Sequence, residues 1–385
     1  MKTIMNLVTE KINKTGALIV AAGMSSRMND FKPLMKIGRY SMIENAVINY
    51  KNSGIDEIII VTGFRENDIK EKLTGYDVKF VHNKDYSKTQ MFDSVCIGLK
   101  EFADNADMIF ITPADCPFVQ TYTLKKMMEE MNNNELYYIR PYYLGRSGHP
   151  LLVSNKCAEI ILEHDGSMGL KGAVNKISEN YKDMSFVDPG ILLDADNPSE
   201  FQKLLSHKEN IKYPSMDICR QIYDNFNISK EIKLHSEKVT EVALSIYDMM
   251  YKRGIILNKD LIVAASMLHD IAKGEKKHDI VAAQWIREMG YKEVSDIIEE
   301  HMHLRDYNDE ITEKEVVYLA DKLVAGDRLV TIEQRFTAKE ELYANDPDVL
   351  KIIKGRKELA MKCYSMIYKQ EENNICATET SLEEK

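Results

Sequence analysis

The sequence predicts two domains of different fold class, an α/β domain with a mainly parallel sheet followed by an all-α domain. Three observations support this prediction. The chain has 385 residues, which is more than one hydrophobic core usually supports. In the first half, short β-branched apolar runs alternate with segments of helical spacing, whereas the second half has helical spacing throughout. Between them, the polar residues 206–214 end in Pro214 and are typical of a linker.

The composition limits the classes of function that fit this chain. Its formal net charge of −10 argues against nucleic-acid binding as the main function, so we expect no nucleic-acid partner. No stretch approaches the ~18 consecutive apolar residues of a membrane span, so we expect no membrane partner. The six cysteines form no CxxC pair and are expected to be reduced thiols. We therefore expect a cytoplasmic protein that binds nucleotides and metal ions.

The first domain, residues 15–205, is predicted to be Rossmann-like with three layers. Apolar runs predict buried strands at 16–22, 57–62, 78–81 and 107–112. Helical spacing covers 42–50, 67–73, 91–102 and a segment that begins near Gln120. Strands and helices in this alternation form right-handed βαβ units with parallel strands. Ligands of such sheets bind at the carboxyl ends of the strands.

The remainder of this domain has a less regular pattern. Residues 145–153 combine a Gly-rich turn with a β-run, and helical spacing follows at 154–163 and 168–177. Residues 187–201 predict a strand that carries Asp194 and Asp196. A helix is expected to start at Asn197-Pro198, because proline is favoured in the first turn of a helix.

Polar and charged residues follow the predicted strands. The strand at 16–22 ends in the turn Gly23-Met24-Ser25-Ser26, and Arg27 and Lys32 come next. Small residues let backbone N–H groups approach a polyphosphate, and the two cations can neutralise it. Asp115 follows the strand at 107–112, where a carboxylate can hold Mg²⁺ against phosphates or cap the next helix. Asp196 has the same two interpretations, as a metal carboxylate or as a helix cap.

The stretch AAGMSSRM…KPL resembles the signature of the MobA-like NTP-transferase family, which activates sugars, alditols and the molybdenum cofactor. The stretches GHPLLV and DPGILLDADNPSEF are similar to its molybdenum-cofactor cytidylyltransferase branch. This resemblance implies that Asp115 and Asp196 hold Mg²⁺. It also implies a set of nucleotide-binding loop residues: Ala21, Ala22, Gly23, Ser25, Arg27 and Lys32. Gln90 and Phe92 replace the small residues usual in the family, which leaves the base and acceptor preference open.

The reaction implied is the attack of an acceptor phosphate on the α-phosphorus of an NTP, with pyrophosphate as the leaving group. Negative charge spreads over the α-phosphate and the leaving group in the transition state. Arg27, Lys32 and a Mg²⁺ ion held by Asp115 and Asp196 would stabilise that charge from fixed positions. We expect Arg27, Lys32 and Asp115 to be catalytic. His149 has two interpretations, as an acid or base and as part of a structural Gly-His-Pro turn.

The second domain, residues 215–370, is predicted to be all-α, and the polar residues 371–385 are predicted to be disordered. Helical spacing covers 217–223, 231–251, 259–271, 280–289, 294–303, 313–329 and much of 339–368. The dyad His269-Asp270 ends an apolar helix, and His235 and Asp321 lie on other apolar helices. Burying an imidazole beside a carboxylate is costly without a partner, whereas a divalent metal ion satisfies both groups.

This second pattern resembles the HD superfamily of metal-dependent phosphohydrolases, over about residues 230–336. The resemblance implies six metal ligands: His235, His269, Asp270, His278, His301 and Asp321. His303 is the alternative to His301. The two residues are two positions apart and so face different sides of a helix, and we expect His301 to be the ligand. Lys273 matches a phosphate-contacting lysine that we expect to serve catalysis. The family hydrolyses phosphate esters with a metal-activated water, and these ligands suit one or two Mn²⁺, Fe²⁺ or Mg²⁺ ions.

Taken together, these patterns predict a bifunctional enzyme. The first domain is expected to transfer a nucleotidyl group, with CTP favoured, to a phosphorylated small molecule, and the second to act as a phosphohydrolase. The resemblance implies molybdopterin or its molybdenum-loaded form as the acceptor, and contact with molybdoenzyme maturation proteins. The alternative is a nucleotidyltransferase for a sugar or alditol phosphate, with the HD domain as a regulatory nucleotide-binding module.

Overall fold

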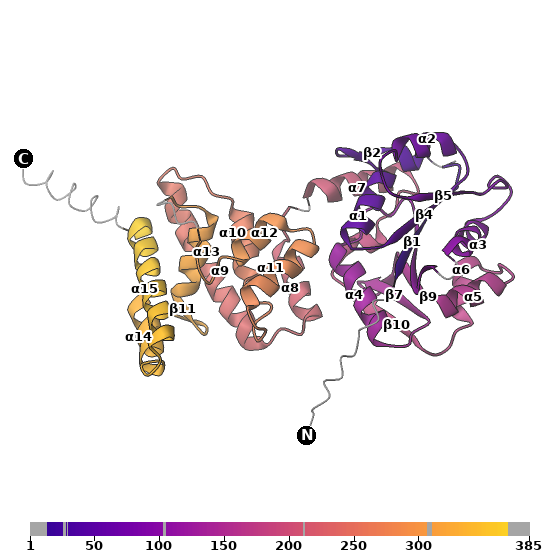
Figure 1. The fold of residues 1–385 in the computed structure, drawn as a ribbon. Coiled ribbons are helices and arrows are strands. Elements are labelled where there is room, and N and C mark those ends of the chain that lie inside the picture. The colour runs from indigo at the N-terminus through magenta and orange to yellow at the C-terminus, as the bar shows by residue number, and fades with distance from the viewer. Residues whose placement is uncertain are drawn as a thin grey trace, which may run out of the picture. The chain divides into compact units, whose positions relative to one another are not determined.

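The computed structural model describes residues 14–25, 28, 30–102, 105–210, 212–305 and 310–368. The chain divides into two compact units, residues 1–210 and 211–385, and Figure 1 shows the mixed α/β unit and the helical unit. Arg27 and the tail at 371–385, both named in the sequence-based predictions, lie outside the described residues. No helix in the described part of the chain is long and apolar enough to cross a membrane.

The first unit is built on one sheet with the strand order β10-β7-β9-β6-β1-β4-β5, and β8 pairs with β7. The neighbouring strands β6, β1, β4 and β5 are parallel, whereas β9 is antiparallel to both β6 and β7. The bounds are β1 Thr15–Ala21, β4 Glu57–Thr62, β5 Lys79–His82, β6 Met108–Pro113, β7 Tyr138–Tyr143, β8 Arg146–Ser147, β9 Leu151–Ser154 and β10 Tyr181–Ser185. The predicted α/β class with a mainly parallel sheet is confirmed.

Helices cover both faces of this sheet, as Figure 1 shows. Helices α3, α5 and α6 pack together on one face, and α1 and α4 pack on the other. The bounds are α1 Met42–Asn52, α2 Glu66–Lys72, α3 Met91–Phe102, α4 Thr121–Asn133, α5 Asn155–Glu163, α6 Gly169–Asn175 and α7 Pro198–Asn210. A short hairpin, β2 Lys36–Ile37 and β3 Tyr40–Ser41, precedes α1.

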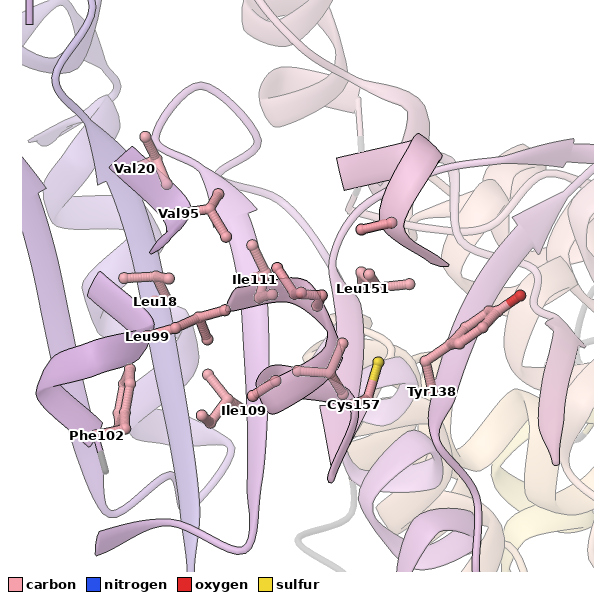
Figure 2. Close-up of a cluster of buried hydrophobic side chains, with 14 of the residues drawn as sticks. Leu18, Val20, Val95, Leu99, Phe102, Ile109, Ile111, Tyr138, Leu151 and Cys157 are labelled. Carbon is pink, nitrogen blue, oxygen red and sulfur yellow. The ribbon is translucent and has the colours of Figure 1, made fainter. Parts of the chain in front are cut away.

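The core beneath α3 fixes the strand ends that carry the candidate site. Leu18 of β1 packs with Val95 and Leu99 of α3 in one buried cluster, which Figure 2 shows. Gly98 allows α3 to approach closely, because a Cβ atom there would lie 2.2 Å from Leu18 Cδ1. This close packing holds β1 and β6 in fixed positions, and with them the carboxyl ends that carry the candidate site.

The structure corrects three details of the predicted first domain. The predicted strand within 187–201 is wrong, since Pro189–Leu192 forms a 3₁₀ helix, η3, and Pro189 has no N–H to donate to a sheet. Strands β7 and β10 were not predicted, because Pro141 interrupts one apolar pattern and the other strand is polar and exposed. Helix α7 extends to Asn210, because the first residues of the predicted linker contain no helix breaker.

The second unit is a bundle of helices with one short hairpin. The bounds are α8 Met216–Asn225, α9 Lys230–Lys252, α10 Lys259–Leu268, α11 His278–Glu288, α12 Lys292–Ile298, α13 Glu313–Lys322, α14 Ile332–Leu342 and α15 Pro347–Tyr368. The prediction of one helix over 313–329 is wrong, because α13 ends at Lys322 and the hairpin β11 Val324–Ala325 and β12 Arg328–Leu329 follows. Gly326 has a φ of +61° and supplies the turn.

Candidate active sites

Three charged side chains of the first unit meet beyond the carboxyl end of the sheet. Lys32 lies in the 3₁₀ helix η1, Lys32–Leu34, Asp115 follows β6, and Asp196 precedes α7. The Lys32 Nζ atom is 2.8 Å from Asp196 Oδ1 and 3.2 Å from Asp115 Oδ2. The fold thus brings together the lysine and both carboxylates that the sequence predicts for a nucleotide and metal site.

The loop after β1 is held in place by its own residues. Ser25 has a φ of +54°, and its Oγ atom accepts a hydrogen bond of 3.1 Å from the backbone N–H of Lys32. Ala21 and Ala22 are buried where β1 ends, whereas Gly23 is exposed. A cavity of about 190 Å³ opens beside this loop and is lined by Val20, Ala22, Gly23, Tyr86, Thr89, Gln90, Met91 and Ser94. The loop therefore lines the same cavity as Gln90, the residue that differs from the family pattern.

The start of helix α4, which Asp115 was one candidate to cap, is instead bound by Asp188, a residue that was not predicted. Asp188 Oδ2 accepts hydrogen bonds from the Gln120 backbone N–H, at 2.8 Å, and from Thr123 Oγ1, at 2.7 Å. Burial raises the pKa of Asp188 to about 6. The only local signal was the DPG turn, which does not reveal a partner 68 positions away. At α7, Asn197 Oδ1 accepts a hydrogen bond from the Glu200 N–H and acts as a cap.

The two stretches that suggested the cytidylyltransferase branch lie against each other. The backbone N–H of His149 donates to the Ile191 carbonyl at 2.8 Å. Gly148 is required at this approach, because a Cβ atom there would lie 2.0 Å from the Ile191 oxygen. The GHP turn therefore supports the segment that leads to Asp194 and Asp196.

The electrostatics of the first site favour a bound cation. Burial tends to lower the pKa of Lys32, but the hydrogen bonds and charges of Asp196 and Asp115 outweigh it and raise that pKa. Burial raises the pKa of Asp194, and the charge of Asp115 raises it further. Burial also lowers the pKa of His149 against the attraction of Asp115, so the ring is neutral at pH 7. The carboxylates of Asp115 and Asp196, with Asp194 close enough to feel their charge, form an oxygen-rich site that suits Mg²⁺.

In the second unit, the six predicted ligands converge from five segments. His235 lies on α9, His269 and Asp270 follow α10, His278 begins α11, His301 follows α12, and Asp321 lies on α13. His301 is buried, with 2% of its surface exposed, whereas His303 is exposed. The structure therefore places His301, and not His303, in the cluster.

Asp270 lies between two groups of histidines. Its Oδ2 atom is 3.7 Å from His235 Nε2 and 3.6 Å from His269 Nε2. Its Oδ1 atom is 3.3 Å from His278 Nε2 and 3.7 Å from His301 Nε2. In each group, together with Asp270, the ligand atoms lie within 4.8 Å of one another. This geometry can hold two metal ions that share Asp270.

The orientation of the imidazoles fits a metal centre. The Nδ1 atoms of His235, His269 and His301 lie 2.7–2.8 Å from the backbone carbonyls of Gly326, Ser266 and Ile298, respectively. Their Nε2 atoms are buried and have no hydrogen-bond partner among the described residues. Ligating histidines commonly donate from one ring nitrogen while the other binds the metal. Two divalent ions, one in each group, would satisfy the three orphaned Nε2 atoms.

Cations surround the two carboxylates of this cluster. The Lys273 Nζ atom lies 2.5 Å from Asp270 Oδ2, and half of the side chain is exposed, so Lys273 lies between the cluster and solvent. Asp321 is buried and lies 3.3 Å from His235 Nε2. Burial tends to raise its pKa, but Lys322 and Arg335 hold that pKa well below its usual range. Lys322 and Arg335 were not predicted from the sequence, because helical spacing does not identify a cation beside a metal ligand.

One family model matches within each unit of the chain. Residues 17–182 match the family model of the MobA-like NTP transferase domain, and residues 233–326 match that of the HD domain. Both family predictions are therefore confirmed. An NTP transferase domain together with an HD domain indicates an enzyme.

Individual relatives match the first half. The molybdenum cofactor cytidylyltransferase of Escherichia coli K12 is 26% identical over 185 residues, which is 48% of this chain and 92% of that protein. The bifunctional protein GlmU of Staphylococcus haemolyticus is 29% identical over 115 residues, 29% of this chain and 25% of GlmU. The crystal structure of Rv0371c from Mycobacterium tuberculosis superimposes with a TM-score of 0.44 and 20% identity, covering 50% of this chain and 99% of that one.

Proposed function

We propose, from the premise that the chain carries a MobA-like NTP transferase domain and an HD domain, that its first domain transfers CMP from CTP to the phosphate of a molybdopterin-type acceptor. The observation that carries this proposal is the position of Lys32 between Asp115 and Asp196 at the carboxyl end of the sheet. The match to most of the Escherichia coli molybdenum cofactor cytidylyltransferase supports the choice of base and acceptor. The acceptor and the Mg²⁺ requirement belong to this proposal.

The side chains divide the work of transfer. Asp115 and Asp196 would hold Mg²⁺, which when bound supplies charge neutralisation at the triphosphate. Lys32 is kept protonated by these carboxylates and supplies a fixed positive charge. The backbone of the loop at Gly23 is exposed and can approach phosphate oxygens. No covalent nucleophile is required, because the acceptor phosphate attacks the α-phosphorus directly and pyrophosphate leaves.

We further propose that the HD domain is a metal-dependent phosphohydrolase. The three orphaned Nε2 atoms around Asp270 support this proposal. The six residues His235, His269, Asp270, His278, His301 and Asp321 would hold one or two divalent ions such as Mn²⁺, Fe²⁺ or Mg²⁺, whose chemistry is to lower the pKa of a bound water. Lys273 would contact the substrate phosphate. The cytoplasmic location and the contact with molybdoenzyme maturation proteins stay predictions of the sequence.

A thermal-shift panel tests the transferase assignment. The full-length protein is heated with each of the four NTPs and Mg²⁺, and with EDTA in place of Mg²⁺ as the control. CTP with Mg²⁺ should raise the melting temperature most, since a ligand at 100 times its Kd adds about 2.7 kcal/mol to stability. No shift with any NTP would remove the transferase proposal. A larger shift with another NTP would favour the sugar- or alditol-phosphate alternative.

A phosphatase assay tests the hydrolase assignment. The full-length protein is incubated with Mn²⁺ and an aryl phosphate monoester or diester. We expect hydrolysis that survives Lys32→Met and is lost in His269→Ala, because the two residues belong to separate sites. Activity that is equal in His269→Ala and the parent would contradict a catalytic metal centre. Metal binding without hydrolysis would favour the regulatory alternative for this domain.

A further inference from the structure

Lys322 on α13 is a buried ammonium with a complete set of partners. Only 4% of its surface is exposed. Its Nζ atom donates to Asp321 Oδ2 at 2.7 Å and to the His301 backbone carbonyl at 2.9 Å, and it lies 4.7 Å from the centroid of the Tyr318 ring. A buried charge is tolerated when it is paired and hydrogen-bonded. The contacts fix the ammonium at one position.

The two hydrogen-bond acceptors of Lys322 belong to opposite sides of the histidine cluster. Asp321 lies beside His235, at 3.3 Å from its Nε2 atom. His301 lies on the other side of Asp270, at 3.7 Å from its Oδ1 atom. One ammonium therefore joins a candidate ligand of the first ion to the backbone of a candidate ligand of the second.

The same contact orients the Asp321 carboxylate. Lys322 contacts Oδ2, whereas Oδ1 faces His235. Arg335 of α14, which lies beyond the residues that match the HD domain, places one nitrogen 3.2 Å from the same Oδ1 atom and another on the Val324 carbonyl. Lys322 and Arg335 therefore fix the orientation of the Asp321 carboxylate from two sides.

We propose that Lys322 is a positioning residue of the metal centre, which fixes the orientation of the Asp321 carboxylate and keeps His301 in register with it. This inference rests on the proposed metal centre of the HD domain. It predicts the direction in which metal affinity changes when Lys322 is removed. If Lys322 acted only through its charge, its removal would strengthen cation binding, because a nearby positive charge would be lost. If it positions the ligands, its removal weakens binding.

The test is a Mn²⁺ titration of the full-length protein, with free Mn²⁺ measured by electron paramagnetic resonance. Lys322→Met removes the ammonium, and Lys322→Gln keeps an N–H donor without charge. Lys314→Met is the matched control, because Lys314 also joins α13 to the segment before His301, through a 2.5 Å contact with Glu300. His269→Ala removes a candidate ligand. Thermal unfolding in EDTA measures the stability of each metal-free variant.

We expect Lys322→Met to lower Mn²⁺ affinity by about 10- to 100-fold, the usual effect of losing a residue that orients a ligand. Lys322→Gln should lose less, and Lys314→Met should bind as the parent does. Unchanged or increased affinity in Lys322→Met, or an equal loss in Lys314→Met, would overturn the proposal. If Lys322→Met does not fold, the Gln variant decides in the same way. A parent protein that binds no Mn²⁺ would overturn the metal centre itself.

Discussion

Lys32 and Asp196 are 164 positions apart in the chain, yet the Lys32 ammonium lies 2.8 Å from Asp196 Oδ1. The contact joins the loop after the first strand to the segment before α7. Asp115 completes the group at 3.2 Å. The charge that we propose for nucleotidyl transfer is therefore assembled from both ends of the first domain.

Replacing Lys32 with Met should lower the rate of pyrophosphate release by about 10²- to 10³-fold, the usual cost of losing one group that stabilises transition-state charge. Asp115→Ala should abolish the reaction. Lys36→Met is the control, because Lys36 is exposed on the neighbouring strand β2. Near-parental turnover in Asp115→Ala would exclude the assignment of this site.

Replacing His301 with Ala should remove at least one bound Mn²⁺ ion per chain, whereas His303→Ala should keep the parental number. The reason is that His301 is buried beside Asp270 and His303 is exposed. Metal content after dialysis against Mn²⁺, measured by elemental analysis, distinguishes the two variants. Loss of metal in His303→Ala alone would show that the ligand assignment is wrong.

Stability of the first domain should depend on Asp188 in a defined pH window. Burial raises its pKa from 3.8 to about 6 in the folded state, so the folded protein binds more protons than the unfolded chain between these values. This contribution to the free energy of unfolding therefore increases as the pH falls from 7 to 5, by about 1 kcal/mol. The contribution is fully present below pH 3.8 and is lost as the pH rises through the folded-state pKa of about 6.

Comparison of the parent with Asp188→Asn isolates this contribution, since Asn does not titrate and the other groups cancel. Urea denaturation followed by circular dichroism gives the free energies at pH 5 and pH 7. The single tryptophan, Trp285 in α11, reports the unfolding of the second domain separately. A stability difference between the two proteins that does not change with pH would contradict the prediction.

Replacing Gly148 with Ala should impair nucleotidyl transfer without removing any charged group. The added Cβ atom would meet the Ile191 carbonyl at 2.0 Å, so the backbone that leads to Asp196 must move. Rates of pyrophosphate release, at saturating NTP and Mg²⁺, measure the effect. Ser147→Ala at the neighbouring exposed position is the control, and equal rates in both variants would show that the segment tolerates displacement.

The sequence by itself determined the class of both domains and the residue types of both sites. Apolar runs and helical spacing are local, so β1, β4 and α3 were predicted within a residue of their observed bounds. The NTP loop and the His-Asp pattern are local motifs as well. Strands β7 and β10 were missed and the segment at 189–192 was wrongly assigned to a strand, because prolines or polar residues interrupt the periodicity of these segments.

Only the tertiary structure decided which groups meet. Asp188 reaches α4 from 68 positions away, His301 rather than His303 faces Asp270, and Lys322 joins both sides of the histidine cluster. These contacts depend on how strands and helices pack and on the direction in which each side chain leaves its backbone. Spacing along the chain carries no information about such long-range geometry, and for that reason the sequence could supply the candidates but not their partners.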